Sequence, residues 1–519
     1  MKLGQIARML AGFMLFFTFS LGVPLVVSLR EEGVETIEGW ALGGTTVSFL
    51  VAIVVGLVAA LLLWLAGRKS STNLFRREGL AVVGLAWFLA GGLAATPFVW
   101  SGAISSPVNA YFEAMSGLTT TGATVLGTAN IDIESLPQSI LLWRSMLQWM
   151  GGIGIVLVFI VLLPSVGVTG SRLLSSEQIG MSDDAVRPRM AQQARQLLGL
   201  YALLTGSAAL SYWLVGLSGF DAICHAFTTV ATGGFSTHNS SVGGFQSLGV
   251  ELVAVVFMFL AGCNFLLIIS TLIQRGRATA SSGLYRVEFR VYVGIIVVVS
   301  LVIALILFRQ GPSGADSIGV VHDYRDFGRC LRDGVFQTVS LATGTGYANA
   351  DFQSWPKPAL YLIFVCMFIG GCTGSTTGGF KVFRVLVCAK LAGYVLRHFV
   401  RPRSVEKLRL GHNLIADRVV VGVLGLLLLW IATVTVGAFV LMLDPHLDFV
   451  SSVTASLSMM GCVGPAFGDV AAGGIDLGPY AGYGELHPGA KIFMSVQMVL
   501  GRLEILLPLA LLTPGFWRR

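Results

Sequence analysis

The sequence predicts an all-α polytopic membrane protein, and three observations lead to this fold class. Hydrophobic residues make up 55% of the 519 residues, charged residues make up 12%, and the mean hydropathy is +0.79. Such a composition is typical of chains that cross a bilayer many times. Ten apolar segments are long enough to cross a bilayer, and an eleven-residue frame that closes on glycine occurs four times between them.

Two spanning helices precede the first frame, and we expect them over residues 8–29 and 40–67. The first has a basic start, but it is too long for the apolar core of a signal peptide and has no small-residue cleavage site. We therefore interpret residues 1–70 as a leading transmembrane helix pair outside the repeat.

The four frames indicate one structural unit used four times. They are FEAMSGLTTTG, CHAFTTVATGG, FQTVSLATGTG and TASLSMMGCVG, and their closing glycines are 112, 112 and 118 residues apart. Each unit is expected to hold a spanning helix, a short helix with a loop, and a second spanning helix. The expected segments are 77–100, 109–122 and 139–164; 193–217, 221–234 and 246–273; 289–309, 333–346 and 358–394; 413–443, 451–464 and 490–513. The unit boundaries are expected at 71–190, 191–285, 286–405 and 406–519.

Each short helix is expected to begin at a residue whose side-chain oxygen suits a helix N-cap. These residues stand thirteen positions before the closing glycines, and they are Asn109, Asp221, Asp333 and Ser451. A helix of about nine residues is too short to cross a bilayer. Each short helix and its loop are therefore re-entrant, which is tolerated at membrane depth where they line protein or a water-filled path.

The short helices predict a site for a cation. A helix C-terminus carries partial negative charge, so four such ends on one axis would favour a positive ion. The Thr/Gly segments that follow would offer carbonyl oxygens in place of the ion's water shell. The complete prediction is two leading transmembrane helices plus four helix–pore loop–helix units in a pseudo-fourfold arrangement around one pore.

The third loop, Thr-Gly-Thr-Gly-Tyr at 343–347, resembles the Thr-Val-Gly-Tyr-Gly selectivity filter of potassium channels. The other three loops keep only the central glycine, so we expect a preference for potassium over sodium that is less strict than in fourfold-symmetric channels. The expected ion-binding residues of the filter are Thr120, Thr121, Gly122, Thr232, Gly233, Gly234, Gly344, Thr345, Gly346, Cys462, Val463 and Gly464.

Over essentially its whole length, the chain resembles the potassium-uptake superfamily of TrkH, KtrB and fungal Trk transporters. The motifs that carry the resemblance are Thr-Thr-Thr-Gly-Ala-Thr at 119–124, Gly-Gly-Phe-Ser-Thr-His-Asn at 233–239 and Gly-Pro-Ala-Phe-Gly at 464–468. The extra leading helix pair makes the chain similar to the TrkH branch rather than to KtrB. The resemblance implies potassium uptake across a bacterial inner membrane, a homodimer, and cytosolic nucleotide-binding RCK subunits such as TrkA. The chain itself has no nucleotide motif, so we expect no cofactor in it.

A glycine-rich stretch interrupts the second helix of the third unit. Residues 370–379 hold five glycines and four hydroxyl residues, and each glycine costs about 1 kcal/mol relative to alanine in a helix. We expect a loop at mid-membrane, and the resemblance implies that this loop is a gate under the filter. The expected gate residues are Gly370, Gly371, Thr373, Gly374, Ser375, Thr376, Thr377, Gly378, Gly379 and Arg502. The alternative is an intact helix that packs tightly through small residues.

Arg502 stands where the other three units have glycine. Alignment of the second helices places Gly152, Gly262, Gly371 and Arg502 at one position. Counted from Lys491, Arg502 lies about 16 Å inside the membrane, where a charge costs at least about 3 kcal/mol. We expect it to point into the pore near residues 370–379 and to raise the barrier to cations. An ion pair with Glu504 of a neighbour is the alternative.

The net charge of +7 does not indicate nucleic-acid binding, because the basic residues gather in particular loops. These loops hold Arg68, Lys69, Arg76 and Arg77; Arg275, Arg277, Arg286 and Arg290; Lys390, Arg397, Arg401, Arg403, Lys407 and Arg409; and Arg518 with Arg519. The opposite loops are acidic or mixed, as at Glu31, Glu32, Glu35 and Glu38. The positive-inside rule then places both termini in the cytoplasm and the glycine loops outside.

Other polar residues have two interpretations each. His225 and Glu113 lie on the short helices, where hydrogen bonding behind the loops is favoured over proton coupling. Lys381 and Arg384 are expected at the inner membrane interface. The basic stretch 397–409 is expected to bind anionic lipid or a cytosolic partner. The seven cysteines are scattered and are interpreted as buried free thiols.

Gated, channel-like potassium conduction is the leading functional hypothesis. A potassium symporter coupled to protons or sodium is the alternative, and it would use broken helices and titratable groups at the midplane. The sequence indicates a broken helix in only one unit and few acids in mid-membrane, which disfavours the symporter. A membrane enzyme or receptor is disfavoured because the chain has no paired catalytic groups and no large extramembrane domain.

Overall fold

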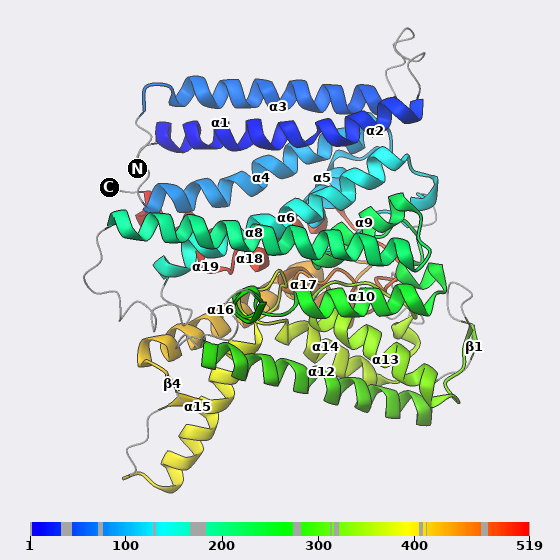
Figure 1. Ribbon diagram of the computed structural model, residues 1–519, viewed down its shortest axis with the longest axis vertical. Helices are drawn as coiled ribbons and strands as arrows, with labels where there is room; N and C mark the ends of the chain where they lie inside the picture. Colours follow the sequence, from blue (N-terminus) through cyan, green and yellow to red (C-terminus); the bar gives the residue numbers. More distant parts are fainter. Residues whose placement is uncertain are drawn as a thin grey trace.

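A computed structural model describes most of the chain, and most of the described part is helical (Figure 1). The described residues are 3–32, 44–70, 76–127, 131–166, 183–272, 282–311, 314–315, 321–403, 408–411, 413–468 and 476–517, without the side chains of 76, 155–191, 272, 282, 315 and 321. Several charged residues used above for the loop argument lie outside these ranges, namely Glu35, Glu38, Arg275, Arg277, Lys407, Arg518 and Arg519.

The leading helix pair is present, with a first span longer than the predicted 8–29 and a second that begins at Thr45 and not at residue 40. Helices α1 (Leu3–Ser20) and α2 (Gly22–Glu32) together form one apolar span, and α3 (Thr45–Gly67) forms the next. Gly56 lets α3 approach its neighbours, because a Cβ atom there would lie 2.2 Å from the Thr18 hydroxyl and 2.9 Å from a methyl of Leu93 on α4. The outer side of α3 exposes apolar side chains, as expected of a face toward lipid.

Four units follow, each with a long first helix, a short helix and a second helix. The first holds α4 (Arg76–Trp100), α5 (Pro107–Leu118) and α6 (Gln138–Val166). The second holds α8 (Asp183–Leu214), α9 (Gly219–Val230), α10 (Leu248–Ala261) and α11 (Phe265–Leu272). The third holds α12 (Ser282–Gln310), α13 (Phe327–Ala342), α14 (Lys357–Ile369) and α15 (Val382–Val400). The fourth holds α16 (Asp417–Leu441), α17 (Phe449–Gly461), α18 (Pro488–Arg502), α19 (Leu506–Leu512) and α20 (Pro514–Trp517).

The remaining elements are short and connect these helices. They are the 3-10 turns η2 (Ile133–Ser135), η3 (Ser241–Phe245) and η4 (Phe352–Ser354), and the antiparallel pairs β1 (Gly314–Ala315) with β2 (Val321–His322) and β3 (Arg409–Leu410) with β4 (Asn413–Leu414). The start of α1 and helix α19 lie at one end of the bundle, whereas strand β1 lies at the other (Figure 1).

The second helices are broken more often than the sequence predicted. The helices α10 and α11 meet at a bend of 95°, residues 370–381 separate α14 from α15, and residues 503–505 separate α18 from α19. The expectation of a broken helix in only one unit is therefore wrong. Among the described residues, six helices are long and apolar enough to cross a membrane in one piece, or seven if the bent pair is counted.

The short helices begin earlier than predicted, so the four expected N-caps are wrong. The actual caps are Ser106, Ser218, Asp326 and Asp448, and the helices contain 12, 12, 16 and 13 residues. Two of the expected caps bond to the true cap from three residues further on. The Ser218 hydroxyl accepts the N–H of Asp221 and donates to its carboxylate, and Asp448 accepts the N–H of Ser451. These capping partners carry the same kind of side-chain oxygen as a cap, so the sequence alone predicts them as the caps.

Candidate ion pathway

All four short helices end in the same hydrogen-bonded turn. A residue one or two positions past each helix end adopts the left-handed region, with φ of 53° at Thr120, 55° at Thr232, 69° at Gly344 and 50° at Cys462. The Thr120 N–H bonds the Gly117 carbonyl at 3.0 Å, and the next N–H, of Thr121, bonds the Ser116 carbonyl at 2.9 Å. The same pair of bonds runs from Thr232 and Gly233 to Thr229 and Thr228, from Gly344 and Thr345 to Leu341 and Ser340, and from Cys462 and Val463 to Met459 and Ser458. This is the Schellman motif, which ends a helix sharply.

The closing glycines repeat the left-handed conformation two residues later. Their φ angles are 82° at Gly122, 80° at Gly234, 77° at Gly346 and 104° at Gly464. The residue between the two left-handed positions has negative φ in every unit. Such alternation turns successive carbonyl groups toward one side of the backbone, and glycine adopts it at the least steric cost.

The four glycine segments form a closed ring. A Cβ atom on Gly122 would lie 2.1 Å from the Gly233 carbonyl oxygen, and one on Gly234 would lie 1.8 Å from the Thr345 oxygen. Likewise, a Cβ on Gly346 would lie 2.1 Å from the Val463 oxygen, and one on Gly464 would lie 2.7 Å from the Thr121 oxygen. Each unit therefore touches the next at a glycine, and the fourth touches the first. An open cavity borders all four glycines and is also lined by Arg144, His238, Asn239 and Tyr483.

A buried ion pair supports the first two loops from behind. Glu113 on α5 and Arg144 on α6 are 0% and 2% exposed, and their Oε1 and Nη2 atoms lie 2.9 Å apart. Glu113 also accepts the Val125 N–H at 2.9 Å, and Arg144 donates to the Ser236 carbonyl at 3.1 Å. Glu113 thus hydrogen-bonds behind the loop, which is the interpretation that the sequence favoured.

The second loop has two further supports. His225 is fully buried, and its two ring nitrogens lie 2.9 Å from the Asp221 carbonyl and 3.1 Å from the Ser236 hydroxyl. Gln148 on α6 donates to the Gly233 carbonyl at 2.7 Å and accepts the Phe235 N–H at 3.1 Å. Sequence analysis did not identify Gln148, because a glutamine in a long apolar helix carries no motif of its own.

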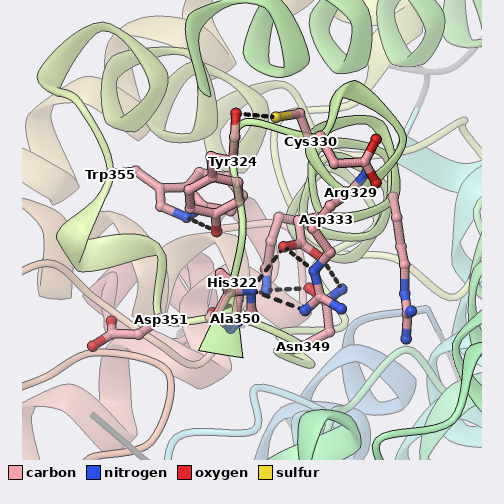
Figure 2. A network of polar contacts seen from close by, with 12 residues as sticks. His322, Tyr324, Arg329, Cys330, Asp333, Asn349, Ala350, Asp351 and Trp355 are labelled. Atoms are coloured by element: carbon pink, nitrogen blue, oxygen red, sulfur yellow. Dashed lines mark hydrogen bonds and ion pairs between the residues drawn. The ribbon is translucent and has the colours of Figure 1, made fainter. Parts of the chain in front are cut away.

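Asp333 organises a polar network behind the third loop (Figure 2). Its Oδ2 atom lies 2.9 Å from Nδ1 of His322 and 3.0 Å from Nε of Arg329, and its Oδ1 atom accepts from Asn349 at 3.0 Å. Asn349 also donates to Glu251 at 3.2 Å. Because Asn349 lies two residues past Tyr347, the last residue of the third loop, the network fixes the chain as it leaves that loop.

Outside the spanning segments, Asp444 anchors the start of α18. Burial favours its protonated form, but the backbone N–H groups of His487, at 2.7 Å, and His446, at 3.1 Å, stabilise the carboxylate more strongly. These bonds lower the pKa of Asp444 below its ordinary value.

The stretch at 370–379 is a loop, so the alternative of an intact, tightly packed helix is wrong. Gly370, Gly374 and Gly379 adopt φ between 74° and 78°, which glycine allows and a helix does not. The loop lies directly under the ring: a Cβ atom on Gly378 would lie 1.9 Å from the carbonyl oxygen of Gly461, at the end of α17. The hydroxyls of Ser375, Thr376 and Thr377 are buried and bond within the protein, as between Ser375 and Thr377 at 2.7 Å.

Arg502 reaches this loop. Its guanidinium is 3% exposed, and it donates to the Thr376 carbonyl at 2.7 Å and to the Gly151 carbonyl of α6 at 3.3 Å. Gly501 lets the end of α18 pack closely against Met460 of α17, because a Cβ atom on Gly501 would lie 2.1 Å from the Met460 carbonyl oxygen. The structure therefore brings Arg502 and residues 370–379 together beneath the four-glycine ring.

One alternative and one expectation about neighbouring charges are wrong. Glu504 forms an ion pair with Arg384 of the same chain rather than with Arg502. Lys381 and Arg384 are 3% and 5% exposed, so they lie in the interior and not at the membrane interface. The Lys381 ammonium donates to the Thr377 hydroxyl at 3.0 Å. The loop geometry explains the error, because the chain turns back at residues 370–381 and carries these cations inward.

Comparison with known proteins agrees with this architecture. The family model TrkH, described as a cation transport protein, matches residues 46–514. The chain is 34% identical to the Trk system potassium uptake protein TrkH of Salmonella typhimurium and 33% identical to that of Escherichia coli K12, over 100% of each chain. The crystal structure of the potassium transporter TrkH from Vibrio parahaemolyticus superimposes with a TM-score of 0.84 at 32% identity, again over 100% of both chains. The chain is therefore a multi-pass membrane protein that belongs to the TrkH family of cation transport proteins.

Proposed function

We propose that this protein takes up potassium across a bacterial inner membrane by gated, channel-like conduction. The observation that carries the proposal is the closed ring of four glycine segments, each at the C-terminal end of a short helix. Carbonyl groups in such a ring replace the water shell of a monovalent cation, and the helix ends add negative potential. The relatives that match the full chain are named potassium uptake proteins. Potassium is then the transported substrate and not a resident cofactor.

The gate in this proposal consists of residues 370–379 and Arg502. The loop packs against the end of α17, directly below the ring, and Arg502 holds the Thr376 carbonyl at 2.7 Å. A fixed positive charge on the pathway raises the energy of a passing cation, and the bond keeps the loop in place.

The experiment is ion flux through the purified protein in liposomes. Conduction predicts a potassium flux that follows the potassium gradient, exceeds the sodium flux, and is unchanged when a proton gradient is imposed. A protein that moves no potassium under any gradient refutes the proposal.

Symport coupled to protons or sodium is the second candidate, and one structural finding favours it. Three second helices are interrupted, at 262–264, 370–381 and 503–505, and broken helices frame the binding sites of many secondary transporters. The same liposomes decide between the two candidates, because a symporter accumulates potassium against its gradient when the coupling ion runs inward.

We further propose that the chain forms a homodimer and binds TrkA-like RCK subunits on its cytosolic side, with both termini on that side. Helix α15 projects from the bundle (Figure 1) and exposes Phe399 at 86% and Val400 at 75% among basic residues. Such a helix suits a protein partner or anionic lipid. Light scattering of the purified protein tests the dimer, and co-purification with nucleotide-binding subunits tests the assembly. Nucleotide dependence is then expected only when those subunits are present.

A further inference from the structure

Glu288 joins the 370–381 loop and the start of α15 to a different helix. It lies on α12 and is 2% exposed. Its Oε1 atom accepts the N–H of Thr373 at 2.6 Å and the N–H of Phe383 at 3.2 Å. Thr373 belongs to the first half of the loop, and Phe383 is the second residue of α15. One carboxylate oxygen therefore bridges the entrance and the exit of the loop.

These two hydrogen bonds stabilise the Glu288 carboxylate because it is buried. A carboxylate removed from water is strongly destabilised unless hydrogen-bond donors surround it. The N-terminus of α15 adds favourable potential, because a helix start carries partial positive charge. A loop that moved away from this position would remove the bond to Thr373 and leave the carboxylate buried with fewer donors. Glu288 therefore favours the observed position of the loop over any displaced one.

The remaining contacts of the loop show what Glu288 adds. The first half also docks on the break between α10 and α11, where the Cys372 N–H bonds the Gly262 carbonyl at 2.9 Å. The second half is held from α18, through Arg502 and the Thr376 carbonyl. Glu288 is the contact that ties the loop and the start of α15 together to α12.

We infer that Glu288 is a positioning residue that latches the 370–381 loop under the four-glycine ring by accepting the N–H of Thr373 in the loop and the N–H of Phe383 at the start of α15. This inference rests on the proposed function, in which the loop is the gate. The group that holds the loop is the acceptor oxygen of the Glu288 side chain. Glutamine keeps that oxygen, leucine removes it, and aspartate withdraws it by one methylene.

The test follows loop position and ion flux separately. Cys372 lies inside the loop and is 1% exposed, so its rate of alkylation, mapped by mass spectrometry, reports loop displacement. Cys366 on α14 is equally buried and serves as the internal standard. Loss of a charge-assisted hydrogen bond shifts a two-state equilibrium about tenfold or more. In Glu288→Leu we expect Cys372 labelling and rubidium flux in liposomes to rise about tenfold or more, while Cys366 labelling stays unchanged.

The control variants separate positioning from folding. Glu288→Gln is expected to restore wild-type labelling and flux to within about threefold. Glu251→Leu removes another buried carboxylate, one that pairs with Arg332 and does not touch the loop, and it is expected to lower stability without raising Cys372 labelling. If Glu288→Leu does not fold, Glu288→Asp carries the test with the same expected direction.

The outcomes are distinct. A folded Glu288→Leu or Glu288→Asp protein with wild-type Cys372 labelling overturns the latch, and a glutamine variant that labels as fast as the leucine variant overturns the acceptor-oxygen argument. If labelling responds as expected while no variant conducts potassium, the latch stands and the proposed function fails.

Discussion

Replacing Arg502 with alanine is the most direct perturbation of the proposed gate. The guanidinium donates a charge-assisted bond to the Thr376 carbonyl at 2.7 Å, and such bonds contribute about 1.5–3 kcal/mol. Its loss should raise the population of displaced loops by roughly 10- to 150-fold, since 1.4 kcal/mol corresponds to about a factor of ten. Removal of the charge also lowers the barrier for a cation, since two unit charges about 8 Å apart at an effective dielectric constant of about 20 repel each other by about 2 kcal/mol.

Two further variants divide these contributions. Arg502→Gln removes the charge but keeps a donor for the Thr376 carbonyl, so it should show mainly the electrostatic gain, about tenfold or more. Arg502→Lys keeps the positive charge but loses the hydrogen bond that the wild-type arginine donates to the Gly151 carbonyl at 3.3 Å. The assay is initial potassium flux into proteoliposomes at matched protein content, with size-exclusion profiles as the folding control. Alanine and glutamine variants that fold normally and conduct at the wild-type rate would refute the gating role of Arg502.

Three further outcomes are expected. Gly346→Ser should weaken discrimination between potassium and sodium, because its Cβ would lie 2.1 Å from the Val463 carbonyl oxygen at φ of 77°; unchanged relative permeability from reversal potentials would count against the filter. Glu113→Ala should destabilise the protein by about 3–5 kcal/mol, because Arg144 would stay buried without its partner; an unchanged melting temperature in detergent would show that the pair is dispensable. The stabilisation from Asp444, whose pKa is lowered in the folded state, is fully present above the unfolded pKa of about 3.9 and is lost as the pH falls through the lower folded pKa. The difference in melting temperature between wild type and Asp444→Asn should thus be constant near neutral pH and shrink in acid, and a difference that persists at the lowest pH would contradict this assignment.

The fourfold repeat made the fold predictable from the sequence, but it did not give the first residues of the short helices correctly. The four frames placed the short helices and their glycine ends, because a period near 112 residues survives differences in the residues themselves. The helix starts were misplaced because Asp221 and Ser451 have the chemistry of a cap while they serve as its bonding partners. A side-chain oxygen in the sequence does not by itself show whether the residue is the N-cap or the residue that bonds to the N-cap.

The interior contacts of the site were the least predictable part. Glycine density revealed the loop at 370–379, but a break at 503–505 passes through Leu503, Glu504 and Ile505, which contain no glycine or proline. Glu504 and Ile505 adopt φ of 59° and 55°, a conformation uncommon for such residues and genuinely rare for a β-branched one. Glu288 and Gln148 were not identified either, because each meets partners about 85 residues away in sequence.

The ring around the proposed pathway is built from one polypeptide, and this has a genetic consequence. Each of its four joints, at Gly122, Gly234, Gly346 and Gly464, faces a different neighbouring residue. In a homotetramer one codon change alters every quarter of such a ring at once, whereas here it alters a single quarter. Ion preference in this architecture can therefore be adjusted in small steps, one side at a time, with the other three sides left intact as the reference.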